Sequence, residues 1–199
     1  ITRAGVRGTK LALGNPHILG GDVSGDIVDV GAQVNCLKFG DRVVVNPKLP
    51  CYKCQCCVAN KPEMCIKPGM IGSTVNGGYA EYVSVPATNV VVIPSNISYE
   101  EAASLPTVFL PCWSILLKRA DLKPWETVLI LSASSGVGTA AIQVAKNVIG
   151  ARVIATTSSN IKKQKALDLG ADHVINYTKD NILNAIGELT NNRGADVVV

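Results

Sequence analysis

The sequence is poor in aromatic residues and in charge, and it holds no long apolar run. Aromatic residues make up 5% of its 199 positions, charged residues 17%, and the net charge is only +4. Without a basic stripe interleaved with aromatic side chains, it lacks the usual nucleic-acid surface. No stretch reaches the roughly 18 apolar residues of a spanning helix, and no signal peptide is visible. We therefore expect a cytoplasmic protein that binds a small molecule, with no nucleic-acid or membrane partner.

Cysteine, by contrast, is concentrated in one segment, where five of the seven cysteines fall within fifteen positions. Cys51, Cys54, Cys57 and Cys65 follow the spacing C-x2-C-x2-C-x7-C. Four thiolates at such separations can close a tetrahedron around zinc at about 2.3 Å per bond, which leaves no position for water or substrate. The spacing predicts one structural zinc ion. A C-x-x-C redox pair and disulfides are the alternatives, which the loop-like, proline-containing context disfavours.

The other thiols and the two histidines carry weaker signals. Cys56 is expected to point away from the cluster, and Cys36 and Cys112 are expected to be ordinary buried thiols. His17 precedes a turn and His173 opens an expected strand, so neither is expected to be catalytic.

The chain changes character near residue 97. Before it, short β-branched runs bounded by turn residues predict strands at residues 25–31, 41–45, 79–85 and 90–93. Ser98 and Glu101 resemble a capping box that opens a helix through Ala103, and a second helix is expected from Pro111 to about Lys118.

From Glu126 onward, apolar strands alternate with helices. Strands are expected at residues 128–131, 153–155, 173–176 and 195–199, with helices at 136–148, 161–169 and 180–189. This alternation predicts an α/β region with a parallel sheet and helices on both faces.

A glycine-rich turn follows the first of these strands. Its residues are Ser134, Ser135, Gly136, Val137 and Gly138. Between a strand and a helix, such a turn lets the backbone approach a pyrophosphate at the positive end of the helix dipole. Only Gly138 fits the G-x-G-x-x-G spacing, so the motif alone is a weak signal for a dinucleotide cofactor.

The end of the next strand bears on the choice of cofactor. About 20 residues beyond the turn, where NAD-binding chains usually place a carboxylate for the ribose, the sequence has hydroxyl side chains, including Ser158, followed by Lys162. These groups would accept a 2′-phosphate without charge repulsion, which favours NADPH over NADH. The alternative is that Lys162 belongs to a solvated helix face.

Taken together, these motifs resemble the zinc-containing branch of the medium-chain dehydrogenase/reductase superfamily, especially its quinone-oxidoreductase-like and alcohol dehydrogenase-like members. The segments that carry the resemblance are residues 16–22, 40–43, 77–82, 140–146 and 169–177, together with the cysteine segment.

The resemblance implies a fold and cofactor contacts. Residues 1–110 would form a GroES-like β-barrel substrate domain with a zinc lobe at about 46–76, and residues 111–199 a Rossmann doubly wound sheet. In NADPH-using members, a Lys after the second Rossmann strand and a Tyr after the third contact the 2′-phosphate, and Lys162 and Tyr177 match these positions. We expect an internal piece of a longer protein, inactive alone, and a homo-oligomer at full length.

The departures from the family pattern concern a second, catalytic zinc ion. Gly20-Gly21-Asp22 stands where zinc-dependent members carry Gly-His-Glu, Thr107 stands at the position of a Cys ligand, and the third ligand position would precede Ile1. We therefore expect no catalytic zinc and an NADPH-dependent transfer of hydride to a quinone, enone or enoyl thioester. The alternatives are alcohol and aldehyde interconversion, or a non-catalytic, zinc-stabilised binding protein.

Overall fold

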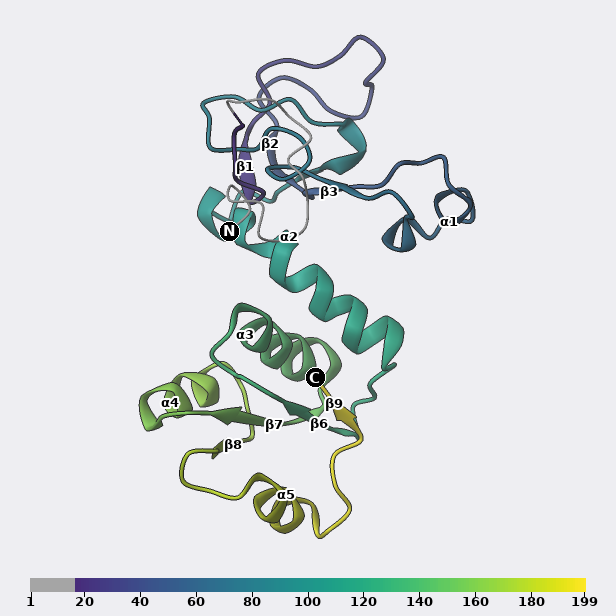
Figure 1. Ribbon diagram of the computed structural model, residues 1–199. Coiled ribbons are helices and arrows are strands. Elements are labelled where there is room, and N and C mark those ends of the chain that lie inside the picture. The colour runs from purple at the N-terminus through teal and green to yellow at the C-terminus, as the bar shows by residue number, and fades with distance from the viewer. Residues whose placement is uncertain (1–16) are drawn as a thin grey trace. The chain divides into compact units, whose positions relative to one another are not determined.

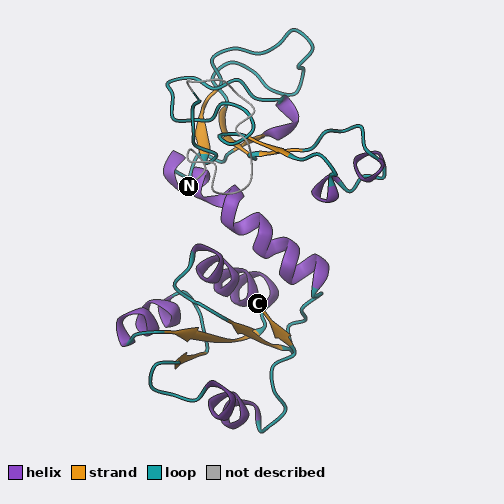
Figure 2. Cartoon of the chain, viewed as in Figure 1, coloured by secondary structure: helices purple, strands orange, loops and turns teal. Residues whose placement is uncertain are grey.

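The computed structural model describes residues 17–199, so the first sixteen residues of the expected substrate domain lie outside it. The chain divides into two units, residues 1–107 and 108–199 (Figures 1 and 2). Within the described part, no helix is both long enough and apolar enough to cross a membrane.

The first unit is built on a three-stranded antiparallel sheet in the order β1-β2-β5. Its strands are β1 (Val23–Asp26), β2 (Arg42–Val45) and β5 (Val90–Val92). The central strand β2 is the most buried of the three, and it pairs with β1 along one edge and with β5 along the other. Val44 packs with Ile93 and Ala102 in a small core.

A smaller sheet carries the cysteine segment, which projects as a lobe in Figure 1. It pairs β3 (Lys48–Leu49) with β4 (Gly69–Met70), and between them lie α1 (Gln55–Val58) and a 3-10 turn at Pro62–Met64. The buried Asn89 fixes the base of the lobe, since its amide donates to the carbonyls of Asn46 at 2.7 Å and Lys48 at 2.6 Å. Asn89 ends the 3-10 turn before β5, so the lobe is tied to the sheet.

Two strand predictions in this unit need correction. The strand expected at 25–31 begins earlier, at Val23, and ends at Asp26. The strand expected at 79–85 is not formed, and Tyr79 and Tyr82 are 80% and 71% exposed. The backbone N–H of Tyr79 donates instead to the carbonyl of Leu19 at 2.9 Å, so a turn contact replaces a strand ladder.

The two helices expected between residues 98 and 118 are one continuous helix. It comprises α2 (Tyr99–Trp113) and a π-helical continuation at Ser114–Arg119. Its capping box is confirmed, because the Ser98 N–H donates to Glu101 Oε2 at 2.9 Å and the Glu101 N–H donates to Ser98 Oγ at 3.2 Å. The prediction of a break was wrong because Cys112 and Leu116, both fully buried, anchor the helix in the second unit's core.

The second unit holds a four-stranded parallel sheet in the order β8-β7-β6-β9, as the alternation predicted. Its strands are β6 (Thr127–Ile130), β7 (Arg152–Thr157), β8 (His173–Asn176) and β9 (Val197–Val198). The helices between them are α3 (Gly136–Gln143), which continues as a π-helix at Val144–Ile149, α4 (Asn160–Asp168) and α5 (Ile182–Thr190).

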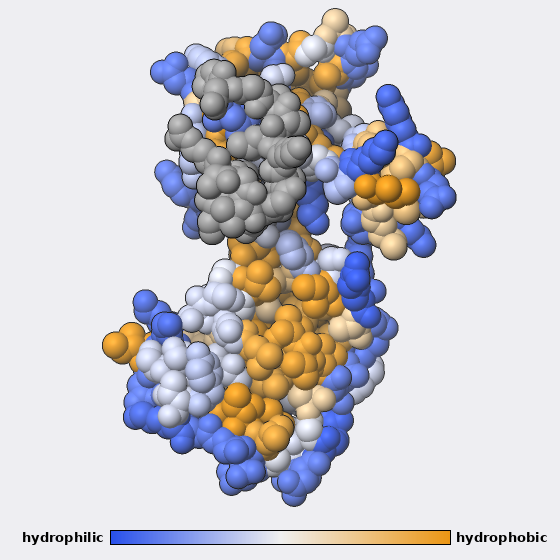
Figure 3. Space-filling view, viewed as in Figure 1, coloured by the Kyte–Doolittle hydropathy of each residue, from blue (hydrophilic) through white to orange (hydrophobic). Residues whose placement is uncertain are grey.

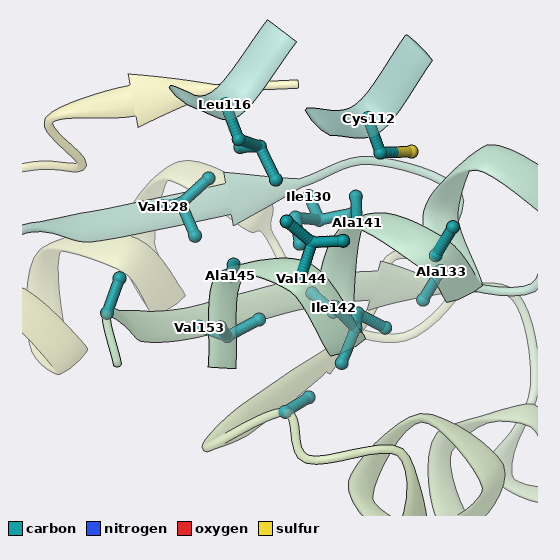
Figure 4. Close-up of a cluster of buried hydrophobic side chains, with 14 of the residues drawn as sticks. Cys112, Leu116, Val128, Ile130, Ala133, Ala141, Ile142, Val144, Ala145 and Val153 are labelled. Carbon is teal, nitrogen blue, oxygen red and sulfur yellow. The ribbon is translucent and has the colours of Figure 1, made fainter. Parts of the chain in front are cut away.

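Successive strand residues face opposite sides of this sheet, and the helices cover both sides. Val128 and Val153 belong to the core that includes residues of α3 and α4 (Figure 4). Leu129 and Ile154 belong to a second core completed by Ile186 of α5. Because both faces are covered, the strands are almost continuously apolar, which is the pattern that the sequence showed.

Candidate zinc centre and cofactor site

The four cysteines of the predicted zinc site converge in the lobe of the first unit. The Sγ atoms of Cys51, Cys54, Cys57 and Cys65 all lie within 4.8 Å of one another. The Sγ of Cys57 is 3.9 Å from that of Cys51 and 3.5 Å from that of Cys54. A tetrahedron with Zn–S bonds of about 2.3 Å places its sulfurs about 3.8 Å apart. The donor set therefore fits one zinc ion and forms a four-cysteine structural cluster.

Backbone N–H groups around the cluster stabilise thiolates. The N–H of Cys51 donates to Cys65 Sγ at 3.2 Å, and the N–H of Cys54 donates to Cys51 Sγ at 3.3 Å. Hydrogen bonds from the Ile66 and Cys57 amides lower the pKa of Cys54 to about 6. Desolvation and the adjacent sulfurs raise the pKa of Cys57 to about 12. Without a metal, the surroundings thus favour a thiolate at Cys54 and a neutral thiol at Cys57. A bound divalent cation would favour the thiolate form of all four cysteines.

The remaining cysteines differ in their surroundings. All seven cysteines are free, so the structure gives no support to the disulfide alternative. Cys112 is buried as expected, and burial raises the pKa of its thiol. Cys36 is exposed, so the prediction that it is buried was wrong. It lies in the long connection between β1 and β2, outside the helices and strands.

The glycine-rich turn joins β6 to α3 and is ordered by its own hydroxyl group. Ser135 is the N-cap of α3, and its Oγ accepts a hydrogen bond from the N–H of Gly138 at 2.9 Å. Ser134, Ser135, Gly136 and Val137 are exposed, whereas Gly138 is buried. A Cβ at Gly138 would overlap the carbonyl oxygen of Ser132, so the turn needs glycine there for close packing.

The other predicted cofactor residues lie at the same edge of the sheet. Ser158 follows β7, Lys162 is exposed in the first turn of α4, and Tyr177 follows β8 and is 48% exposed. Because β6, β7 and β8 are parallel neighbours, their carboxyl ends meet at one edge. All eight predicted residues therefore gather where a doubly wound sheet binds its ligand. No acidic residue lies in the first turn of α4.

Two threonines at the end of β7 were not among the predicted site residues. Thr156 Oγ1 accepts a hydrogen bond from the Ser132 N–H at 3.2 Å and thereby holds the glycine-rich turn. Thr157 is 1% exposed, and its hydroxyl has no partner among the described residues. The hydroxyl run at the end of this strand entered the sequence argument for NADPH, but the hydrogen-bond partner of each threonine depends on the tertiary structure.

In the first unit, the residues that stand at the catalytic-zinc positions of the family lie close together. The Thr107 hydroxyl donates a hydrogen bond to the Asp22 carboxylate, and both residues are exposed. At Gly21, a Cβ would lie 3.3 Å from the carbonyl oxygen of Ile71, which is a tight contact. A side chain at position 21 would therefore require the neighbouring backbone to shift by a few tenths of an ångström.

The fold and the site together define a class: a GroES-like domain with a four-cysteine zinc cluster, followed by the parallel sheet of a partial Rossmann domain. The comparisons agree with this class. The alcohol dehydrogenase GroES-like domain family matches residues 2–95, and the zinc-binding dehydrogenase family matches residues 136–199. The chain belongs to the zinc-containing medium-chain dehydrogenase/reductase superfamily, on its alcohol dehydrogenase-like side.

Individual relatives carry two kinds of name. A solved structure described as an NAD-dependent alcohol dehydrogenase is 42% identical with a TM-score of 0.92, covering 98% of this chain and 56% of that one. The NAD-dependent alcohol dehydrogenase of Sulfurisphaera tokodaii is 34% identical over 92% of this chain and 53% of its own length. The quinone oxidoreductase-like protein 2 homolog of Nematostella vectensis is 32% identical over 92% of this chain and 43% of its own length. The chain thus spans about half the length of these relatives.

Figure 3 shows a contiguous orange, hydrophobic area on the second unit. A shallow apolar pocket lies between α2 and the helix that starts at α3, and its lining includes Phe109, Leu110, Trp113, Val144 and Val148. It holds no titratable group, so it adds no candidate for the chemistry of the site.

Proposed function

We propose that this chain belongs to a nicotinamide-dependent oxidoreductase that adds hydride to an activated C=C bond without a catalytic zinc ion. The single observation that carries the proposal is the hydrogen bond between Thr107 and Asp22. Glycine at position 21 agrees with it. In zinc-dependent members, the family resemblance places a thiolate at position 107 and an imidazole at position 21. Here the Thr107 hydroxyl donates to a carboxylate instead, and Gly21 has no side chain that could bind a metal. These two residues therefore do not provide the thiolate and imidazole ligands that zinc prefers.

This residue composition favours substrates that need no Lewis acid. A ketone or aldehyde oxygen gains much from a metal that stabilises developing charge. A quinone, an enone or an enoyl thioester already delocalises that charge through its own carbonyl group. Such substrates need only hydrogen-bond donors close to the oxygen that becomes negative.

The cofactor would supply the hydride, and the second unit would hold its phosphates. The exposed backbone of the turn at residues 134–137 lies at the N-terminus of α3, where N–H groups bind phosphate oxygens. Lys162, with no acidic residue in its turn, favours NADPH. The names of the relatives favour NAD, so the choice between the two cofactors is a proposal about this chain alone.

The cofactor proposal is tested at Lys162 in a full-length form of the protein. Lys162→Ala should raise the KM for NADPH about tenfold and leave the KM for NADH unchanged, because one charge-assisted hydrogen bond to phosphate is lost. Lys165→Ala is the matched control, since Lys165 is an exposed lysine of the same helix. Equal effects on NADPH and NADH would contradict the preference for a 2′-phosphate.

A second candidate function is alcohol dehydrogenation, and the names of the relatives support it better than they support reduction of a C=C bond. Turnover assays on a full-length form separate the two. The first proposal expects oxidation of NADPH with an enone or a quinone, no turnover of simple alcohols, and one zinc ion per chain. Alcohol oxidation with a second zinc ion per chain would establish the second candidate. Failure to alter NADPH fluorescence at all would indicate a non-catalytic, zinc-stabilised protein.

A further inference from the structure

A polar cavity of about 390 Å³ lies in the second unit, at the amino ends of the parallel strands. It is lined by Thr127, Arg152, Thr190, Asn191 and Arg193. Thr127 and Arg152 are the first residues of β6 and β7, whereas the glycine-rich turn follows the last residues of β6. The cavity is therefore at the edge of the sheet opposite the proposed cofactor site.

Arg152 supplies an uncompensated positive charge to this cavity. Its guanidinium lies 3.1 Å from the ring Nε2 of His173, which accepts the hydrogen bond when the ring is neutral. Among residues 17–199, no carboxylate lies within ion-pair distance of Arg152. By contrast, Arg193 is neutralised by Asp196 in a bidentate pair at 2.8 and 2.7 Å.

The loop that forms the other wall is held rigidly. Asp196 accepts hydrogen bonds from Arg193 and from the N–H of Thr127 at 2.8 Å, so this wall is tied to the start of β6. Thr190 is 8% exposed, and its hydroxyl donates to the Ile186 carbonyl at 2.7 Å while accepting from the Gly194 N–H at 2.9 Å. These hydrogen bonds fix the position of the wall, so little of it has to be ordered when a ligand binds.

We propose that this cavity binds one phosphate-like group, either free inorganic phosphate or the phosphoryl group of a small molecule. The Arg152 guanidinium would form charge-assisted hydrogen bonds with the oxygens, for which its planar fork is well suited. The exposed side-chain amide of Asn191 and the Thr127 hydroxyl would supply neutral donors around the same anion. This site is independent of the proposed oxidoreductase activity and of the choice of nicotinamide cofactor.

The two histidines of the chain make the proposal directly testable by NMR of the 199-residue protein. His173 contacts Arg152, which lines the cavity, whereas His17 lies in the other unit. Sodium phosphate is added at fixed pH, with sodium chloride keeping the ionic strength constant. The His173 ring signals should shift and saturate with a Kd on the order of 1 mM, and the His17 signals should not move. Phosphate bound only at the glycine-rich turn would leave His173 unshifted and would overturn the proposal.

Variants identify the group that binds. Arg152→Gln should weaken phosphate binding at least about tenfold, whereas Arg119→Gln, an exposed arginine of the same unit, should bind like the parent. If Arg152→Gln fails to fold, Asn191→Gly serves instead, because Asn191 has φ 52° and glycine adopts this conformation without strain. That variant should bind several-fold more weakly.

The source of the phosphate group is separated by a second titration with glycerol 3-phosphate. Binding as tight as that of inorganic phosphate assigns the site to a phosphorylated small molecule, and much weaker binding assigns it to free phosphate. Either result supports the site. Linear shifts that do not saturate, or unchanged binding in folded Arg152→Gln, would refute it.

Discussion

Substitution of Gly138 by alanine tests the packing of the glycine-rich turn. An added Cβ would overlap the carbonyl oxygen of Ser132 and lie 3.0 Å from Cα of Ala133. Both neighbours are backbone atoms of the turn itself, so they cannot move away as a side chain would. The turn or the start of α3 must shift by about 1 Å, and the packed interior resists such a shift.

The magnitude follows from two opposing effects. Alanine in a helix is favoured over glycine by about 1 kcal/mol, whereas overpacking against a rigid neighbour costs about 1–3 kcal/mol. Because the clash at Gly138 is with backbone, we take the upper half of that range and expect a net loss of about 1–2 kcal/mol. Gly136→Ala is the matched control, since its Cβ would lie 2.9 Å from Cγ1 of Val108, a side-chain methyl that can move. We expect its stability to change by less than about 0.5 kcal/mol.

Urea unfolding measures the difference. Both tryptophans, Trp113 and Trp125, lie in the second unit, so their fluorescence reports on the unit that contains the turn. With an m-value of about 1.5 kcal/mol/M, Gly138→Ala should lower the unfolding midpoint by about 1 M urea. Equal midpoints for the parent and Gly138→Ala would refute the claim that close packing requires glycine here.

The remaining predictions concern the cysteine lobe and the second unit. Cys54→Ser should reduce the zinc content from about one ion per chain to almost none in elemental analysis, whereas Cys56→Ser should keep the ion. Thr156→Val should lower the free energy of unfolding, measured in urea, by about 1 kcal/mol, because the Ser132 N–H loses its acceptor. Thr157→Val should be neutral or stabilising, because the Thr157 hydroxyl has no partner among the described residues. Burial alone would raise the pKa of Asp172, but hydrogen bonds from Lys146 and from the Val153 N–H lower the pKa overall. The ionised carboxylate therefore stabilises the folded state fully above about pH 4, and this stabilisation is lost as the pH falls. Asp172→Asn should therefore flatten the acid side of the stability profile, and an unchanged profile would contradict this.

The sequence determined the zinc cluster and the order of elements in the second unit. The four zinc cysteines lie within fifteen residues, so their spacing was enough to predict the cluster, and their sulfurs lie within 4.8 Å of one another. In the second unit, buried parallel strands require apolar runs, and such runs can be recognised in the local sequence without knowledge of tertiary contacts. The capping box at Ser98 and Glu101 was equally local, and its two hydrogen bonds are present.

Features that depend on contacts between distant residues could not be predicted from local sequence patterns. The continuity of α2 through Pro106 and Pro111 rests on the burial of Cys112 and Leu116 in a core formed by later strands. The exposure of Cys36 could not be read from its identity, because burial depends on which elements cover the residue.

The polar cavity shows the same limit most clearly. Arg152 and Arg193 are far apart in the sequence. They line the same cavity because β6 pairs with both β7, which begins at Arg152, and β9, which follows the loop that contains Arg193. Local patterns fix elements because their signals lie within a few residues. Long-range packing decides which side chains share a cavity and which charges remain unpaired, and the proposed phosphate site depends on both.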